Sequence, residues 1–218
     1  MNIIRMPTPN KDNWEIPVDY LLLHYTAVDI QETLAIFMRL GGIVSAHLVI
    51  DIDGSVYELI DCLDGRTLRG RHAGPSTWQD GNKTWEKFND FSIGIELVNY
   101  NGNIFPYSPA QYKALILIVK RLQRHYPKLN DCNRFLGHEH VAGFRGKADP
   151  GICFDWQLLF DQCFEAQKKR PVRTAVCPAS LQQTLVAFKH FEPEKKQEKS
   201  AYWKGISHIT ESTIKLLS

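Results

Sequence analysis

The sequence predicts a mixed α/β (α+β) fold, because short apolar runs typical of buried strands alternate with segments of helical periodicity. Apolar runs occur at 20–23, 93–98 and 134–137. Helical periodicity occurs at 29–38 and 108–122, each preceded by an N-terminal capping signal. Two further runs, 46–50 and 55–60, flank Asp53-Gly54, which is a strong signal for a β-hairpin.

The remaining segments are less regular. Residues 1–19 contain three prolines and predict an irregular lead-in, and residues 61–90 predict a long loop rich in Gly, Asp, Asn and Thr. A long structureless stretch inside a compact domain is usually functional. A helix is expected over 155–167. Two short amphipathic helices are expected after residue 170, joined by the solvated linker EPEKKQEKS.

Charge divides the chain of 218 residues into two parts. The net charge is +2, which argues against a dedicated nucleic-acid binder. Residues 1–167 carry a net charge of −4 and residues 168–218 a net charge of +6. We therefore expect a main domain at 1–167 and a basic helical C-terminal extension at 168–218. The longest strongly apolar run, 114–119, is too short for a transmembrane segment.

The cysteines and the N-terminus bear on the compartment. The five cysteines are odd in number and lack CxxC spacing, which indicates reduced thiols rather than a disulfide framework. The first ten residues, MNIIRMPTPN, contain no apolar signal-peptide region. Both observations favour the cytoplasm, and an envelope or exported location is the alternative.

Two histidines and one aspartate are the first candidates for chemistry. His24 and His138 each end a predicted strand, and Asp149 follows eleven residues after His138. Strand ends at one edge of a sheet are where α/β scaffolds expose reactive groups. Two imidazoles, one carboxylate and an open fourth position make a catalytic zinc site. The alternative is that both histidines are ordinary surface or hydrogen-bonded residues.

Glu96 and Lys147 each allow two interpretations. Glu96 lies inside an apolar strand, so it either points to solvent on the face it shares with Gly94 and Val98, or serves as a general base. Lys147 lies two residues before Asp149. It is either a solvated surface lysine or a group that stabilises an oxyanion.

Six segments follow one another in a distinctive order over residues 18–160. They are Leu22-Leu23-His24-Tyr25-Thr26, Ser45-Ala46-His47-Leu48-Val49-Ile50 with Asp53-Gly54, His72-Ala73-Gly74, Ser92-Ile93-Gly94-Ile95-Glu96-Leu97, Gly137-His138-Glu139-His140 and Lys147-Ala148-Asp149-Pro150-Gly151. This succession resembles the zinc-dependent N-acetylmuramoyl-L-alanine amidases of the AmpD/AmiD type, which are relatives of the peptidoglycan recognition proteins.

The resemblance implies a fold, a metal site and a reaction. The fold is a central mixed β-sheet flanked by helices, with residues 1–167 as the catalytic domain. The ligands of one Zn²⁺ per chain would be His24, His138 and Asp149, with Glu96 as the catalytic carboxylate and Lys147 beside the oxyanion. The reaction would cleave the amide between N-acetylmuramic acid, or its 1,6-anhydro form, and L-alanine of the peptide stem in peptidoglycan or muropeptides.

Other residues are candidates for substrate binding. Tyr25 follows the first ligand, and Arg71, His72 and Trp78 lie in the long loop that would border the cleft. An aromatic face suits a sugar and Arg suits stem carboxylates. Trp78 could equally belong to a small satellite core. The basic extension has two open roles, which are binding wall polymer and packing on the domain.

Two other functions are weighed against the amidase. A catalytically silent recognition domain would hold peptidoglycan without cutting it; such domains typically lose a metal ligand, whereas all three candidates are present here. A zinc peptidase is the weakest alternative, because the chain contains no HExxH motif.

Overall fold

The centre of the fold is a six-stranded mixed sheet in the order β1-β4-β3-β7-β2-β8. The structure is a computed structural model that describes residues 3–164 and 169–218. The strands of the sheet are β1 (Ile3–Arg5), β2 (Tyr20–Tyr25), β3 (Leu48–Ile50), β4 (Val56–Glu58), β7 (Ser92–Leu97) and β8 (Phe135–Gly137). Strands β3 and β4 pair antiparallel around the predicted Asp53-Gly54 turn, and the other neighbours run parallel. The predicted mixed sheet is confirmed.

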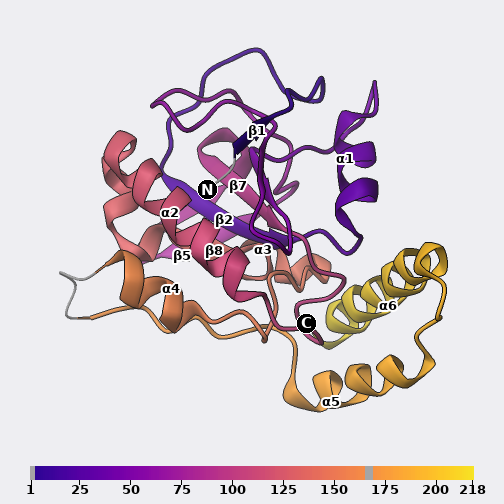
Figure 1. Ribbon diagram of the computed structural model, residues 1–218. Coiled ribbons are helices and arrows are strands. Elements are labelled where there is room, and N and C mark those ends of the chain that lie inside the picture. Colours follow the sequence, from indigo (N-terminus) through magenta and orange to yellow (C-terminus); the bar gives the residue numbers. More distant parts are fainter. Residues whose placement is uncertain (1–2, 165–168) are drawn as a thin grey trace.

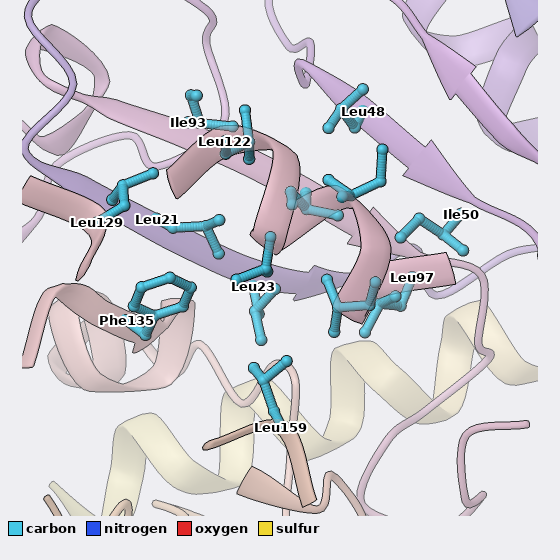
Figure 2. Close-up of a cluster of buried hydrophobic side chains, with 14 of the residues drawn as sticks. Leu21, Leu23, Leu48, Ile50, Ile93, Leu97, Leu122, Leu129, Phe135 and Leu159 are labelled. Atoms are coloured by element: carbon cyan, nitrogen blue, oxygen red, sulfur yellow. The ribbon is translucent and has the colours of Figure 1, made fainter. Parts of the chain in front are cut away.

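One face of the sheet carries the largest core. Helix α2 (Pro109–His125) begins with a capping box between Ser108 and Gln111, with Pro109 at its first position, as the sequence predicts. Together with α4 (Trp156–Cys163), it covers the sheet side chains that point to this face (Figure 2). These sheet side chains include Leu21, Leu23, Ile93, Ile95, Leu97, Leu48 and Ile50.

The opposite face is covered by shorter elements. Helix α1 (Ile30–Met38), capped by Asp29, packs Phe37 against Val49 and Val98. Helix α3 (His138–Ala142) and the hairpin of β5 (Thr77–Asp80) and β6 (Lys83–Glu86) cover the sheet near Tyr20 and Leu22. Because side chains alternate along a strand, His24 and Glu96 point to this second face.

Three local predictions need correction. Strand β1 lies within the predicted irregular lead-in, where it pairs with β4 over only three residues. The β5–β6 hairpin lies within the predicted loop at 61–90, because Gly81 adopts a positive φ and turns the chain between two short strands. Helix α6 (Lys196–Leu217) begins inside the predicted solvated linker.

The C-terminal extension contributes α5 (Ala179–Ala187) and α6, close to the two helices that the sequence predicts. Trp203 of α6 is fully buried in a cluster with Leu185 of α5, Ile104 and Ala148. Figure 1 shows the C-terminal end of α6 near α3. The predicted boundary between residues 167 and 168 lies outside the described residues. The helix predicted at 155–167 ends earlier, at Cys163, because Phe164 leaves the helical conformation. Among the described residues, no helix is both long enough and apolar enough to cross a membrane.

Candidate metal centre and catalytic cleft

His24 and Glu96 lie opposite each other on neighbouring parallel strands. His24 of β2 is the register partner of Glu96 of β7. Both follow apolar residues whose side chains alternate between the two faces of the sheet, so the two polar side chains emerge on the face that α2 does not cover. The strand pairing therefore sets the spacing between the first candidate ligand and the candidate base.

His138 and Asp149 complete a compact group with His24. His138 is the first residue of α3, directly after β8, and β8 is the other neighbour of β2. Asp149 Oδ2 lies 2.9 Å from His24 Nδ1 and 3.1 Å from His138 Nδ1. All three residues are buried, and their ligand atoms lie within 4.8 Å of one another. This group could hold a metal ion.

The hydrogen bonds behind His24 determine which of its ring nitrogens carries the proton. His72 Nε2 donates to the carbonyl oxygen of Ser92 at 3.2 Å, which leaves His72 Nδ1 as an acceptor. His24 Nε2 lies 3.2 Å from that acceptor and therefore donates to it. The His24 Nδ1 that faces Asp149 then carries a lone pair and no proton. Gly94 leaves room for this arrangement, since a Cβ there would lie 2.3 Å from the His72 ring.

His138 is held in the same tautomer by a different acceptor. Its Nε2 donates to the carbonyl oxygen of Ala73 at 3.0 Å, so its Nδ1 also presents a lone pair to Asp149. Two bare imidazole nitrogens and a carboxylate oxygen thus converge without a proton between them. Three lone pairs at these distances repel one another unless a cation lies among them, so the donor set fits a bound metal ion.

Burial makes the His24 imidazole a poor base, whereas the neighbouring histidines make Asp149 a stronger acid. Burial lowers the pKa of His24 to about 4, although the negatively charged Asp149 beside its ring opposes the shift. Burial alone would raise the pKa of Asp149, but the neighbouring His138 and His24 more than offset this and lower it. Neutral imidazoles and an ionised carboxylate are the forms that bind metals.

Glu96 has the properties expected of a general base. Its Oε2 is shielded from solvent and has no hydrogen-bond partner in the described structure. Burial, together with the charge of Asp149, raises the pKa of this carboxyl to about 8, and Lys147 opposes the shift. Glu96 is half-buried and lines the cleft, and a shielded, unpaired carboxylate oxygen is costly unless it has a task, which favours the general base over the solvent-facing interpretation.

Lys147 is partly buried beside the same group. Its Nζ forms an ion pair with Glu211 Oε1 of α6 at 2.7 Å, and about a quarter of its side chain is exposed. Burial by itself lowers the pKa of the ammonium, but Asp149 and Glu211 outweigh that effect and raise it. The lysine is therefore a fixed cation rather than a solvated surface side chain.

A cleft of about 250 Å³ joins these groups. Among its lining residues are the three candidate ligands, Glu96, Lys147 and Glu211. Tyr25 and Arg71 also line it, as expected for substrate-binding candidates. Arg71 is held by Asp12 through its Nε and Nη2 atoms at 3.2 and 2.6 Å and remains partly exposed toward the cleft.

Two substrate-binding candidates lie elsewhere or have another partner. Trp78 is not among the residues that line the cleft; it packs against the small core near Tyr20 and Leu22, which is the satellite-core alternative. His72 borders the cleft, but both of its ring nitrogens are engaged with His24 and Ser92. Sequence reasoning missed Glu211, whose only signal is an acidic residue in a strongly basic extension.

Comparisons with known proteins place this site in a family. A family model described as N-acetylmuramoyl-L-alanine amidase matches residues 14–152, which is more than half of the chain. The chain belongs to this family.

Relatives of this amidase family with assigned names are similar over the same region. The 1,6-anhydro-N-acetylmuramyl-L-alanine amidase AmpD of Haemophilus influenzae is 38% identical over 114 residues, which is 52% of this chain and 55% of that protein. The AmpD of Escherichia coli is 37% identical over 113 residues, 52% of this chain and 55% of that protein. The match thus spans about half the length of these curated relatives.

Solved amidase structures share the fold. A selenomethionine derivative of AmpD is 26% identical with a TM-score of 0.59, covering 74% of this chain and 94% of that one. AmpDh3 of Pseudomonas aeruginosa in complex with anhydromuramic pentapeptide is 25% identical with a TM-score of 0.57, covering 91% of this chain and 76% of that one. The central mixed sheet flanked by helices is therefore that of an AmpD/AmiD-type amidase.

His47, also on the cleft side of the amidase sheet, gives a pH-dependent prediction. It is fully buried, its Nδ1 accepts from the Gly94 amide and its Nε2 donates to the Leu68 carbonyl, and burial lowers its pKa to about 4. In the unfolded chain His47 binds a proton near pH 6.5, whereas in the folded chain it binds the proton only at lower pH. The contribution of neutral His47 to the free energy of unfolding is thus fully present above pH 6.5 and is lost as the pH falls toward 4.

The measurement is chemical denaturation of the chelator-treated protein at several pH values between 7 and 4.5. One such histidine contributes up to about 1.4 kcal/mol per pH unit to the slope. We expect His47→Gln to flatten the pH dependence by up to that amount, whereas the exposed His190→Gln leaves it unchanged. Equal slopes for wild type and His47→Gln would contradict this assignment.

Proposed function

We propose that the protein is a zinc-dependent amidase that hydrolyses the bond between N-acetylmuramic acid and L-alanine of the peptide stem. One observation supports it most strongly: a cluster of three converging lone pairs lies in the same cleft as an unpaired, shielded carboxylate. Converging lone pairs are what a divalent cation requires, and an unpaired carboxylate is what proton transfer requires. A module that only binds peptidoglycan has no need of the carboxylate.

The substrate class comes from the relatives. The curated AmpD relatives are named for the 1,6-anhydro form of the substrate, and AmpDh3 was solved with an anhydromuramic pentapeptide. We propose that this chain acts on 1,6-anhydro-muropeptides in preference to intact peptidoglycan. We further propose a cytoplasmic role in recycling wall fragments, in keeping with the cysteine pattern.

The residues of the cleft have distinct roles in this reaction. Bound zinc supplies polarisation of the scissile carbonyl and a more acidic water. Glu96 accepts a proton from the water whose oxygen bonds to the carbonyl carbon, and it returns the proton to the alanine nitrogen as the C–N bond breaks. Lys147 stabilises the negative charge that develops on the carbonyl oxygen. His24, His138 and Asp149 would hold the zinc.

The test is hydrolysis by the purified, zinc-loaded protein. We expect it to release the free stem peptide, with L-alanine at its new amino terminus, from a 1,6-anhydro-muropeptide, as detected by mass spectrometry. Intact sacculi in a parallel reaction test the preference. Binding of either substrate without any peptide release would instead support the silent recognition domain.

A further inference from the structure

The C-terminal helix reaches into the catalytic cleft through one side chain. Glu211 of α6 lines the cleft together with the candidate ligands, and its Oε1 lies 2.7 Å from Lys147 Nζ. Both side chains are less than one third exposed, so solvent screens this ion pair less than a surface pair. The basic C-terminal extension, residues 168–218, therefore contacts Lys147, the group proposed to stabilise the oxyanion.

The position of Glu211 is fixed by contacts of the preceding turn of α6 and of its own backbone. Thr210 Oγ1 accepts from Asn101 Nδ2 at 3.1 Å, and Ser207 Oγ donates to the Tyr100 carbonyl at 2.8 Å. The backbone carbonyl of Glu211 lies so close to Gly146 that a Cβ there would come within 2.1 Å of it. The helix is thus anchored where Glu211 meets Lys147, one residue after this glycine.

The other charges of the cleft explain why the ion pair between Glu211 and Lys147 matters. Lys147 lies among three carboxylates, those of Glu96, Asp149 and Glu211, and it forms its ion pair with Glu211. A lysine on a flexible four-carbon stem would otherwise be drawn to Asp149 or to the unpaired Glu96. Pairing with either would block a metal ligand or neutralise the base. The ion pair with Glu211 holds the ammonium at one position in the cleft and competes with both of these carboxylates for it.

We propose that Glu211 is a positioning residue for Lys147, so that the C-terminal helix supplies part of the amidase site. This inference rests on the proposed function, because it assigns Lys147 to the reaction. Glu211 acts only through the lysine, and its contribution should vanish when the lysine is absent.

A double-mutant cycle tests this dependence in the full-length protein. The variants are Glu211→Gln, Lys147→Met and the double variant, assayed for kcat and KM on a 1,6-anhydro-muropeptide and for the zinc dissociation constant. Residues that orient a catalytic group typically contribute about 10-fold to 100-fold. We expect Glu211→Gln alone to lower kcat about tenfold with little change in KM and to weaken zinc binding. In the Lys147→Met background, it should change neither quantity by more than about twofold.

Two further variants separate positioning from structural support. Glu198→Gln removes an exposed carboxylate from the same helix and should not reproduce the fall in kcat. Glu211→Asp keeps the charge and should restore at least part of the kcat that Glu211→Gln loses.

The outcomes distinguish this inference from the proposed function. Equal effects of Glu211→Gln in both backgrounds, or no effect in either, would overturn the role of Glu211. A wild-type protein without amidase activity would overturn the proposed function, yet the zinc-affinity cycle would still decide whether Glu211 holds Lys147 away from the ligands.

Discussion

Glu96→Gln is expected to lower kcat for muropeptide hydrolysis by about 10²-fold to 10⁴-fold while leaving the bound zinc in place. The substitution keeps the size of the side chain and removes the atom that takes the proton. Because Glu96 Oε2 has no partner in the described structure, its loss breaks no hydrogen bond that supports the fold. Steady-state kinetics and elemental analysis of the same preparation measure both quantities.

The matched control is Glu86→Gln, which neutralises an exposed carboxylate on β6. It should leave kcat and zinc content unchanged. A Glu96→Gln variant with full activity would remove Glu96 from the mechanism. A variant that lost its zinc as well would show that Glu96 supports the metal centre rather than the proton transfer.

Removing the metal should destabilise the wild-type protein strongly. A metal that binds only the folded state at about 1,000 times its dissociation constant contributes about 4 kcal/mol. For a chain of this size that corresponds to a change in Tm of about 10 °C. We expect a chelator to lower the Tm of the wild type by this order. It should have no effect on His138→Ala, which lacks one of the three ligand atoms.

Asp149→Asn provides a sharper form of the same test. The variant should lose the metal-dependent stabilisation, since an amide is a weaker ligand than a carboxylate. Without metal, however, its NH₂ group can donate to one of the bare Nδ1 atoms that Asp149 Oδ2 faces. We therefore expect metal-free Asp149→Asn to be at least as stable as the metal-free wild type. A clear loss of stability would contradict the assigned tautomers.

Most of the sheet could be predicted from the sequence because its parallel strands are buried on both faces. Continuous apolar runs such as those of β2 and β7 are the direct consequence of that burial. Strand β1 lacks this signal, since its three residues pair at the sheet edge, where two are partly buried and Arg5 is exposed. The β5–β6 hairpin was missed because its exposed and half-buried residues resemble a polar loop.

Only those residues of the candidate site that carry a local sequence signal could be predicted. His24, His138 and Glu96 stand out because each interrupts or ends an apolar run. The role of His72 depends on which nitrogen faces which acceptor, and only the folded geometry provides that. Glu211 is 64 residues from Lys147, and the net charge of the extension conceals the one acidic residue that reaches the cleft.

The most direct test of this account is the position of the metal in crystals of the zinc-loaded wild-type protein, located by anomalous diffraction at the zinc edge. We predict one peak per chain, about 2.0–2.1 Å from Nδ1 of both His24 and His138 and about 2.0–2.2 Å from a carboxylate oxygen of Asp149. A peak bound through the Nε2 atoms, or one that lacked any of these three residues, would contradict it.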